Sequence, residues 1–384
     1  MMVTTNKDET ALTQTATNMN AALYRSFHGP ICVERVDIPP VPPIDGVLIQ
    51  VQATGICRSD WHGWRGHDDD VKNHGLPFCP GHELSGIVVQ STSLHHKCGD
   101  RVAVPFILSC GSCPSCCNGK STVCHDQKQP GFTQWGSFAE YVAIPRATRN
   151  VKRMPDNVTF LQAAALGCRF TTAYRAVLQQ GRLKPNQSVA IFGCGGLGLS
   201  CIMIAKLIGA HVIVAVDVSK AALEKAHTLG ATHTVCSSDA AAATAIVKEQ
   251  VWTITHQQGA QVCIDAAGVA ATCELAVQCT RRGGRMVQVG LPIGGTPPQI
   301  PMGLVAGREL ELVGSHGFAS DDLPILMDLI AAGRLDPLQL VERYVSLEEG
   351  AQILMDMDHT SPLGIAMITN FNANDGNQQS KSKL

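Results

Sequence analysis

Residues 188–217 read SVAIFGCGGLGLSCIMIAKLIGAHVIVAVD, and this stretch decides the fold class of the second half of the chain. An apolar run predicts a buried strand, Gly193, Gly195 and Gly198 follow it, and a second apolar run ends in Asp217. A G-x-G-x-x-G sequence alone is weak evidence, because glycine-rich turns are common. A strand before it, a helix after it and an acid about 20 residues on make it specific for a dinucleotide-binding unit.

The three glycines have different expected tasks. Gly193 permits the tight turn, Gly195 lets a pyrophosphate approach the backbone N–H groups at the helix N-terminus, and Gly198 allows close packing of the helix. Gly196 and Leu197 lie between them, so we expect both to belong to the same cofactor site.

Asp217 indicates which dinucleotide binds. We expect its carboxylate to accept hydrogen bonds from the adenosine ribose and to repel a 2′-phosphate at the same position. The next residues, Val218 and Ser219, supply no arginine that would hold such a phosphate. The sequence therefore predicts NAD as the cofactor in preference to NADP.

The two halves of the chain differ in the pattern of their apolar runs and turn residues. From about Leu161, Ala-rich helical segments alternate with continuous apolar runs, which predict strands covered on both faces and hence a parallel α/β sheet. Between Ala22 and Ile144, short β-like runs are separated by Gly, Pro and Asp turns, which predict a mostly-β, antiparallel and partly barrel-like domain. After Gly314 a helix-like stretch precedes a polar tail, which we expect to be disordered from Asn370 onward.

Size and charge narrow the class of protein. A chain of 384 residues favours two domains over one core. The formal charge is −2 without a basic block, so we expect neither nucleic acid nor a membrane as a partner. The nearest candidate for a transmembrane helix, residues 189–205, is shorter than the roughly 18 apolar residues required and contains glycines, so we expect a strand, a turn and a helix there. The first 20 residues are polar and lack the apolar core of a secretory signal, so we expect reduced thiols.

Residues 109–124, SCGSCPSCCNGKSTVC, carry five of the sixteen cysteines. A C-x2-C-x2-C-x7-C spacing can bring four sulfurs to one tetrahedral zinc, and a closed site of four thiolates braces a loop and performs no chemistry. The alternative is a loop of unligated or redox-active thiols. Cys117 could replace its neighbour by a one-residue slip, but the even spacing favours the set Cys110, Cys113, Cys116 and Cys124.

A second, open metal site is suggested by GICRSDWH at 55–62 and GHELSG at 81–86. These segments hold Cys57 and His82, and a third ligand could come from Cys168 in ALGCRFTTAYRAV. Three protein ligands with one open position make a catalytic zinc. Taken singly, each of these residues is more often a packed side chain than a ligand.

GICRSDWH, PGHELSG, the cysteine-rich loop, ALGCRFTTAY and GCGGLG, in this order, resemble the zinc-dependent alcohol dehydrogenases of the medium-chain dehydrogenase/reductase superfamily. The likeness runs from about Ala22 to Ile368. It implies a GroES-like catalytic domain over 1–169 with a disordered N-terminal tail, and a Rossmann-type doubly wound parallel sheet over 170–315. Residues 316–384 would return to the catalytic domain and end in a flexible tail.

The resemblance also implies roles for individual residues. It implies one structural zinc and one catalytic zinc, the latter bound by Cys57, His82 and Cys168. Glu83 would lie behind that metal as an occasional ligand. Asp60 would orient the His82 ring, and Arg58 would contact the cofactor pyrophosphate.

The two sites together predict a reaction, in which zinc acts as a Lewis acid on the oxygen of an alcohol while a hydride passes to nicotinamide. Ser59 lies two residues beyond Cys57, and His62 titrates near neutral pH, so both could relay the proton to solvent, as the family resemblance implies. A turn-capping serine and a surface histidine are the alternatives. Aromatic residues could line the substrate pocket or belong simply to the core: Trp64, Phe106 and Trp135.

Other functions are compatible with these motifs. The substrate could be a polyol, an amino-acid side-chain alcohol or a thiol adduct of formaldehyde. A protein of another class, a zinc-braced nucleotide-binding protein without turnover, would be expected to lack the catalytic ligands. We expect a small-molecule alcohol or its aldehyde or ketone as the partner, and a homo-oligomer, with a tetramer favoured over a dimer.

The last three residues match a peroxisomal address: Ser382, Lys383 and Leu384. In a eukaryotic host we expect recognition by the peroxisomal import receptor and a location in peroxisomes or a glycosome-like organelle. In a bacterial host the cytoplasm is the default.

Overall fold

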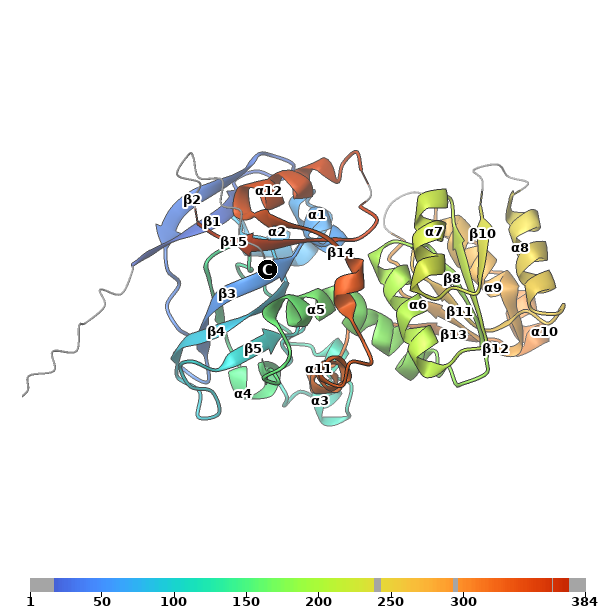
Figure 1. Cartoon of the computed structure of the whole chain (residues 1–384), viewed down its shortest axis with the longest axis horizontal. Coiled ribbons are helices and arrows are strands. Elements are labelled where there is room, and N and C mark those ends of the chain that lie inside the picture. The colour runs from blue at the N-terminus through green and yellow to red at the C-terminus, as the bar shows by residue number, and fades with distance from the viewer. Residues whose placement is uncertain (1–16, 238–242, 293–295, 361, 373–384) are drawn as a thin grey trace, which may run out of the picture.

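The computed structural model describes residues 17–237, 243–292, 296–360 and 362–372. Two lobes lie side by side, and the red C-terminal segment lies with the blue N-terminal half, as Figure 1 shows. Residues 1–16 of the predicted N-terminal tail, and residues 373–384 of the predicted polar tail with the S-K-L end, lie outside the described residues. The prediction that disorder begins at Asn370 is wrong, because Asn370 ends a strand and the carbonyl oxygen of the buried Phe371 accepts from Asn20 Nδ2 at 3.1 Å. No helix in the described ranges has both the length and the apolar character needed to cross a membrane.

The first lobe is built on a mostly antiparallel sheet, in which only β14 and β15 run parallel to each other. The strand order is β14-β15-β3-β4-β5-β7, and β6 also pairs with β3. Its strands are β3 (Val47–Gly55), β4 (Glu83–Ser91), β5 (Arg101–Val104), β6 (Tyr141–Ile144), β7 (Lys152–Arg153), β14 (Val341–Ser346) and β15 (Ile365–Asn370). A separate hairpin-like pair joins β1 (Asn18–Tyr24) to β2 (Ile31–Asp37).

The second lobe is a six-stranded parallel sheet in the order β10-β9-β8-β11-β12-β13. Relative to chain order this is 3-2-1-4-5-6, the arrangement of a doubly wound dinucleotide-binding fold. The strands are β8 (Ser188–Phe192), β9 (Val212–Asp217), β10 (His233–Cys236), β11 (Ala260–Asp265), β12 (Thr280–Gln288) and β13 (Glu311–Gly314). The predicted fold class, an α/β sheet domain beside a mostly-β domain, is confirmed.

The continuous apolar runs of the second lobe have a simple cause. Side chains along β8 alternate between two cores, with Val189 and Ile191 in one and Ala190 and Phe192 in the other. Helices cover both faces, so neither side of the strand meets water. These helices are α6 (Gly196–Ile208), α7 (Lys220–Leu229), α8 (Ala243–Ile254), α9 (Ala270–Cys279) and α10 (Met302–Arg308).

α5 (Phe160–Tyr174) links the lobes, because it packs on β3 and β4 and also on α6. Thr159 and Gln162 form a capping box at its start, and the backbone leaves helical geometry at Gly167, where the axis kinks. A π-helical turn, η2 (Arg175–Gln180), continues it into the second lobe. The domain boundary predicted between residues 169 and 170 falls inside this helix and stays a prediction.

The remaining helices and turns surround the first lobe. They are α1 (Arg58–Trp64), α2 (Asp69–His74), α3 (Pro114–Cys117), η1 (Ser121–Val123), α4 (Ala147–Asn150), η3 (Ser320–Asp322), α11 (Leu323–Ala331), η4 (Pro337–Leu340) and α12 (Leu347–Asp356). α11 matches the helix-like stretch predicted after Gly314. α12 packs against β2 and β15, so the returning chain covers the first lobe.

Candidate active site

The buried carboxylate of Asp60 accepts hydrogen bonds around the N-terminus of α1. Cys57 is the N-cap residue of this helix, and its N–H donates to Asp60 Oδ2 at 3.0 Å. The other oxygen, Oδ1, accepts from the N–H of Gly81 at 2.9 Å and lies 2.8 Å from His82 Nδ1. Asp60 therefore fixes the end of β3 against the loop that precedes β4.

Four potential metal ligands from three parts of the chain meet beside this carboxylate. They are Cys57, His82, Glu83 and Cys168, and their ligand atoms all lie within 4.8 Å of one another. The Nε2 of His82 is buried and has no hydrogen-bond partner among the described residues, because only Nδ1 faces Asp60. Two thiol sulfurs and one imidazole nitrogen with a free lone pair are a donor set that zinc prefers, so the residues fit a metal here.

The titration of the two thiols is linked. A hydrogen bond from Cys168 holds the pKa of Cys57 well below its usual range; burial opposes this shift, and the cationic Arg169 supports it. The pKa of Cys168 is raised, first by the same hydrogen bond and then by burial. Burial would lower the pKa of His82, but the Asp60 carboxylate overcomes it and raises that pKa. Metal ligation requires deprotonated ligands, so a bound cation would release the protons that these groups share.

Glu83 is buried behind the ligand cluster. Its Oε1 accepts from the N–H of Cys168 at 3.0 Å, and its Oε2 lies 3.5 Å from Nη1 of Arg169. Burial raises the pKa of Glu83 to about 7, although the Arg169 charge acts in the opposite direction. Gly167 makes room for this side chain, because a Cβ there would lie 2.5 Å from the Cβ of Glu83.

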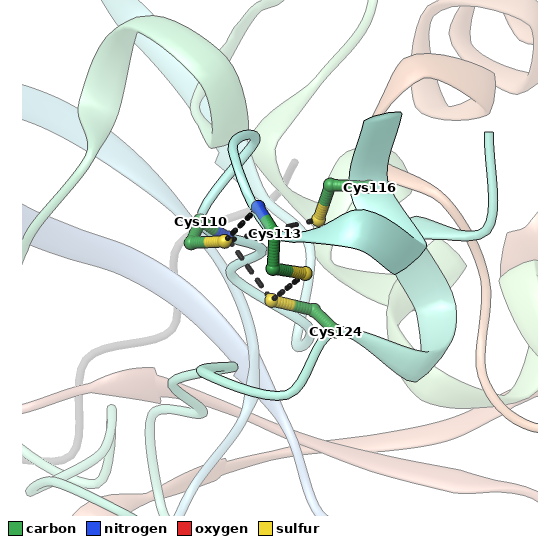
Figure 2. Close-up of side chains that lie close together, drawn as sticks. All are labelled: Cys110, Cys113, Cys116 and Cys124. Carbon is green, nitrogen blue, oxygen red and sulfur yellow. Dashed lines mark hydrogen bonds between the residues drawn. The ribbon is translucent and has the colours of Figure 1, made fainter. Parts of the chain in front are cut away.

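The four-cysteine cluster lies on the loop around α3 and η1, and Figure 2 shows its sulfurs turned toward one another. The Cys110 and Cys116 sulfurs are 4.0 Å apart, and those of Cys113 and Cys124 are 3.8 Å apart. A tetrahedral zinc with bonds of about 2.3 Å separates its ligands by about 3.8 Å. The exposed thiol of Cys117 instead faces the carbonyl oxygen of Ser112 at 3.4 Å.

The four thiols of this cluster differ in pKa, because backbone N–H groups favour the thiolate of Cys110 whereas burial raises the pKa values of Cys116 and Cys124. The N–H groups of Ser112 and Cys113 point at the sulfur of Cys110, at 3.4 and 3.2 Å, and lower the pKa of that thiol to about 6. All sixteen cysteines of the chain lie in described segments and all are free. The geometry therefore fits a metal and gives no disulfide framework.

The glycine-rich turn has the geometry expected of a dinucleotide site. A Cβ on Gly198 would lie 1.8 Å from the carbonyl oxygen of Gly193, so only glycine permits this approach. Gly195 is exposed, with open space where its Cβ would be. Asp217 ends β9, and its two oxygens accept from the N–H groups of Cys194 at 2.6 Å and Ser219 at 2.8 Å. Gly196 and Leu197 begin α6, whose N-terminal N–H groups are free to bind an anion.

Three further predicted site residues lie on α1. Ser59 and His62 are three residues apart, which places them on the same face of the helix. Burial, His67 and Arg58 lower the pKa of His62 to about 4, so the prediction that this residue titrates near neutral pH is wrong. Its Nδ1 lies 3.2 Å from Nδ1 of His67. Arg58 stacks on Trp61, with its guanidinium carbon 4.0 Å from the ring centroid, and its Nη1 donates to the carbonyl oxygen of Met357 at 2.5 Å.

The aromatic residues divide between site and core. The Phe106 ring lies edge-on to His82, with centroids 5.9 Å apart. Phe132, which the sequence did not single out, lies even closer, at 5.1 Å. Trp64 is buried in the first-lobe core and donates to the carbonyl oxygen of Gly29 at 2.7 Å. Trp135 donates from its indole to the carbonyl oxygen of Pro77 and packs on the same core.

Arg169 is the other residue that sequence reasoning missed. It follows Cys168 directly, and its side chain is buried between Glu83, the backbone of Ile56 and Gly196. The signal was a charged residue inside the apolar run ALGCRFTTAY, because a buried arginine needs a partner.

Comparison with known proteins gives the family. Residues 43–156 match the family described as "Alcohol dehydrogenase GroES-like domain", and residues 196–332 match "Zinc-binding dehydrogenase". An alcohol dehydrogenase of Geobacillus stearothermophilus is 35% identical over 336 residues, covering 86% of this chain and 94% of that relative. The chain belongs to the zinc-type medium-chain alcohol dehydrogenases. This family member is therefore an oxidoreductase.

Two further comparisons, one with a curated relative and one with a solved structure, concern the substrates of related enzymes and the fold. A sorbitol dehydrogenase of Bacillus subtilis is 32% identical, covering 82% of this chain and 88% of the relative. The solved structure of the alcohol dehydrogenase TADH from Thermus sp. ATN1 superposes with a TM-score of 0.82 at 29% identity, covering 92% of this chain and all of the other.

Proposed function

We propose that this dehydrogenase transfers a hydride between a primary or secondary alcohol and NAD, giving an aldehyde or ketone. The observation that carries the proposal is the convergence of Cys57, His82 and Cys168, with the Nε2 of His82 lacking a partner in the described chain. A histidine ring whose Nδ1 is held by a carboxylate and whose Nε2 faces two thiols is arranged for ligation.

Each residue near the site has a proposed task. When bound, zinc supplies Lewis-acid chemistry at the substrate oxygen and NAD supplies the hydride acceptor. Asp60 holds the His82 ring, and Ser59 accepts the alcohol proton and passes it toward His62. Its pKa of about 4 makes His62 neutral and only weakly basic near pH 7, so in this proposal the ring passes the proton on to solvent without retaining it. Arg58 would turn from Met357 to contact the cofactor pyrophosphate.

The metal content is part of the proposal. We infer one catalytic zinc at Cys57, His82 and Cys168, with Glu83 behind it, and one structural zinc at the four-cysteine cluster. Metal analysis of the purified protein should give about two zinc ions per chain. About one ion per chain, together with no turnover, would support the non-catalytic alternative of a zinc-braced nucleotide-binding protein.

The substrate class is tested by a panel of primary, secondary, aromatic and polyhydric alcohols with NAD, following nicotinamide absorbance. The rings of Phe106 and Phe132 beside His82 favour an apolar alcohol. The sorbitol dehydrogenase relative supports a polyol as the second candidate. A kcat/KM for sorbitol above that for every monohydric alcohol would identify a polyol, and not an apolar alcohol, as the substrate class. Amino-acid side-chain alcohols and formaldehyde adducts belong in the same panel.

A homo-oligomer is also proposed. β13 is an edge strand of the parallel sheet, and its Leu312 is exposed, as are Leu291 and Met302 on the segments that lead into it. An edge strand offers unpaired backbone groups, and a two-fold axis would let it pair with its own copy. We favour a tetramer over a dimer. Light scattering on the wild type and on Leu312→Lys tests this, with dissociation of the variant expected.

The peroxisomal address of Ser382, Lys383 and Leu384 stays a prediction from sequence. Fusion of the last dozen residues to a fluorescent reporter in a eukaryotic cell tests it, and punctate organellar signal is the expected result. A diffuse cytosolic signal would contradict the prediction.

A further inference from the structure

Arg169 lies at the junction of the two proposed sites. It sits on α5 immediately after the ligand Cys168, and only 8% of the residue is exposed. Its Nη2 donates to the carbonyl oxygen of Ile56, the residue before Cys57. The guanidinium therefore touches the backbone that leads into the metal ligands.

The same guanidinium is incompletely paired. Its Nη1 lies 3.5 Å from Oε2 of Glu83, and neither atom makes a hydrogen bond with any described residue. A buried charge whose donors are incompletely paired is destabilising unless another group compensates it. Arg169 thus has donor capacity left over for a second anion, and Glu83 holds it only loosely.

The stem of Arg169 lies against the dinucleotide loop. A Cβ on Gly196 would lie 2.5 Å from Cδ and 2.8 Å from Nε of this arginine. Gly196 is the first residue of α6, whose N-terminus is where a dinucleotide pyrophosphate binds in this class of fold. One side chain therefore contacts the carboxylate behind the metal and the start of the cofactor helix.

We propose that Arg169 is a positioning residue that couples the dinucleotide site to Glu83, because its guanidinium is shared between that carboxylate and the cofactor pyrophosphate. The inference rests on the proposed NAD-dependent function. Binding of the dinucleotide draws the guanidinium toward α6 and loosens its hold on Glu83. By reciprocity, a weaker carboxylate partner leaves Arg169 freer to bind the cofactor.

The test is a double-mutant cycle read by NADH binding, which is followed by nicotinamide fluorescence in zinc-loaded protein. Arg169→Met should weaken NADH binding about tenfold, because a cation near the pyrophosphate is lost. Glu83→Gln should tighten binding in the presence of Arg169 and leave it unchanged in the Arg169→Met background. The change that Glu83→Gln causes in the Kd for NADH should therefore differ by at least about fivefold between the wild-type and Arg169→Met backgrounds.

A matched control separates coupling from general damage. Arg285 is also buried, at 7% exposed, and contacts both Glu311 and the carbonyl oxygen of Gln180. Arg285→Met should alter NADH affinity by less than about twofold and combine additively with Glu83→Gln. Equal non-additivity with Arg285→Met, or additive effects of Arg169→Met and Glu83→Gln, would overturn the coupling.

A conservative variant keeps the test decisive if Arg169→Met does not fold. Lysine retains the charge but not the planar fork that reaches two acceptors at once. Arg169→Lys should keep NADH affinity within about threefold of the wild type and lose its dependence on Glu83. A wild-type response to Glu83→Gln in this variant would refute the proposal. Failure of the wild type itself to bind NADH would overturn the proposed function instead.

Discussion

The Nδ1 of His82 lies 2.8 Å from Oδ1 of Asp60, and both side chains are at most 1% exposed. The carboxylate also accepts from the backbone N–H groups of Cys57 and Gly81, so it orients a proposed ligand and fixes the backbone of another. Partners of this kind fix the orientation of a metal-binding imidazole and raise its basicity.

Asp60→Asn should therefore weaken zinc binding at the catalytic site by about 10- to 100-fold. The amide has one acceptor oxygen where the carboxylate has two, so at least one of its three donors loses its partner. Zinc retained per chain after dialysis against graded chelator measures the effect. Glu34→Gln, which breaks an exposed pair with Arg25, serves as the control. Equal zinc retention by Asp60→Asn and the control would contradict the prediction.

Cys116→Ser should remove the proposed structural zinc, whereas Cys117→Ser should not. The Cys116 sulfur faces the cluster, and the Cys117 sulfur points to a backbone carbonyl. Because metal binding at such a site stabilises the fold directly, the first variant should contain about one zinc per chain and unfold at a lower temperature. Metal analysis and thermal unfolding of both variants decide this. Loss of zinc from Cys117→Ser instead would mean that the one-residue slip occurs.

His62→Gln should slow alcohol oxidation by about tenfold or more near pH 7 while zinc content stays at the wild-type value. With a pKa of about 4 the His62 ring is neutral throughout this range, so it can act only as a transient carrier of the proton between Ser59 and solvent. The rate is followed by nicotinamide absorbance from pH 6 to 9. His233→Gln on β10 is the control, since this exposed ring hydrogen-bonds to the neighbouring Thr232 and belongs to neither proposed site. Unchanged rates in His62→Gln would remove this residue from the relay.

The lowered pKa of His62 also predicts how the free energy of unfolding depends on pH. The folded pKa of His62 lies below the ordinary value of 6.5, so below about pH 6.5 the unfolded chain takes up the proton first. The free energy of unfolding should then fall as pH drops from about 6.5 toward 4, and be unaffected above that window. His62→Gln should fall less steeply than the wild type in urea unfolding at pH 7, 6 and 5. Parallel curves for the two proteins would argue against the shift.

Asp217→Ser combined with Val218→Arg should move cofactor preference from NAD toward NADP by at least about tenfold in the ratio of kcat/KM values. The first change removes a carboxylate that repels a 2′-phosphate, and the second adds an arginine that can bind it. Val218 is exposed, so the new side chain does not disturb the core. Asp217 also accepts from Cys194 and Ser219, so part of the total activity should be lost. An unchanged ratio would contradict the assigned role.

Local sequence was enough for the features that depend on local geometry. The run from residue 188 to Asp217 predicted strand, turn and helix because each step follows from neighbours in the chain, and the structure has these elements there. The C-x2-C-x2-C-x7-C spacing predicted a compact four-sulfur cluster for the same reason, since a short loop has few ways to arrange its cysteines.

The tertiary structure determined which residues from distant segments of the chain contact one another. Only the fold brings Cys57, His82 and Cys168 within reach of one ion, and sequence alone suggested it through resemblance. It also decided which cysteine of the adjacent pair faces the cluster, because the turn of α3 directs the two sulfurs differently. The partners of Arg169 come from three separate segments of the chain, and no spacing rule relates them. Contacts between segments far apart in sequence are fixed by packing of the whole chain, which is why the proposed coupling between the two sites became visible only there.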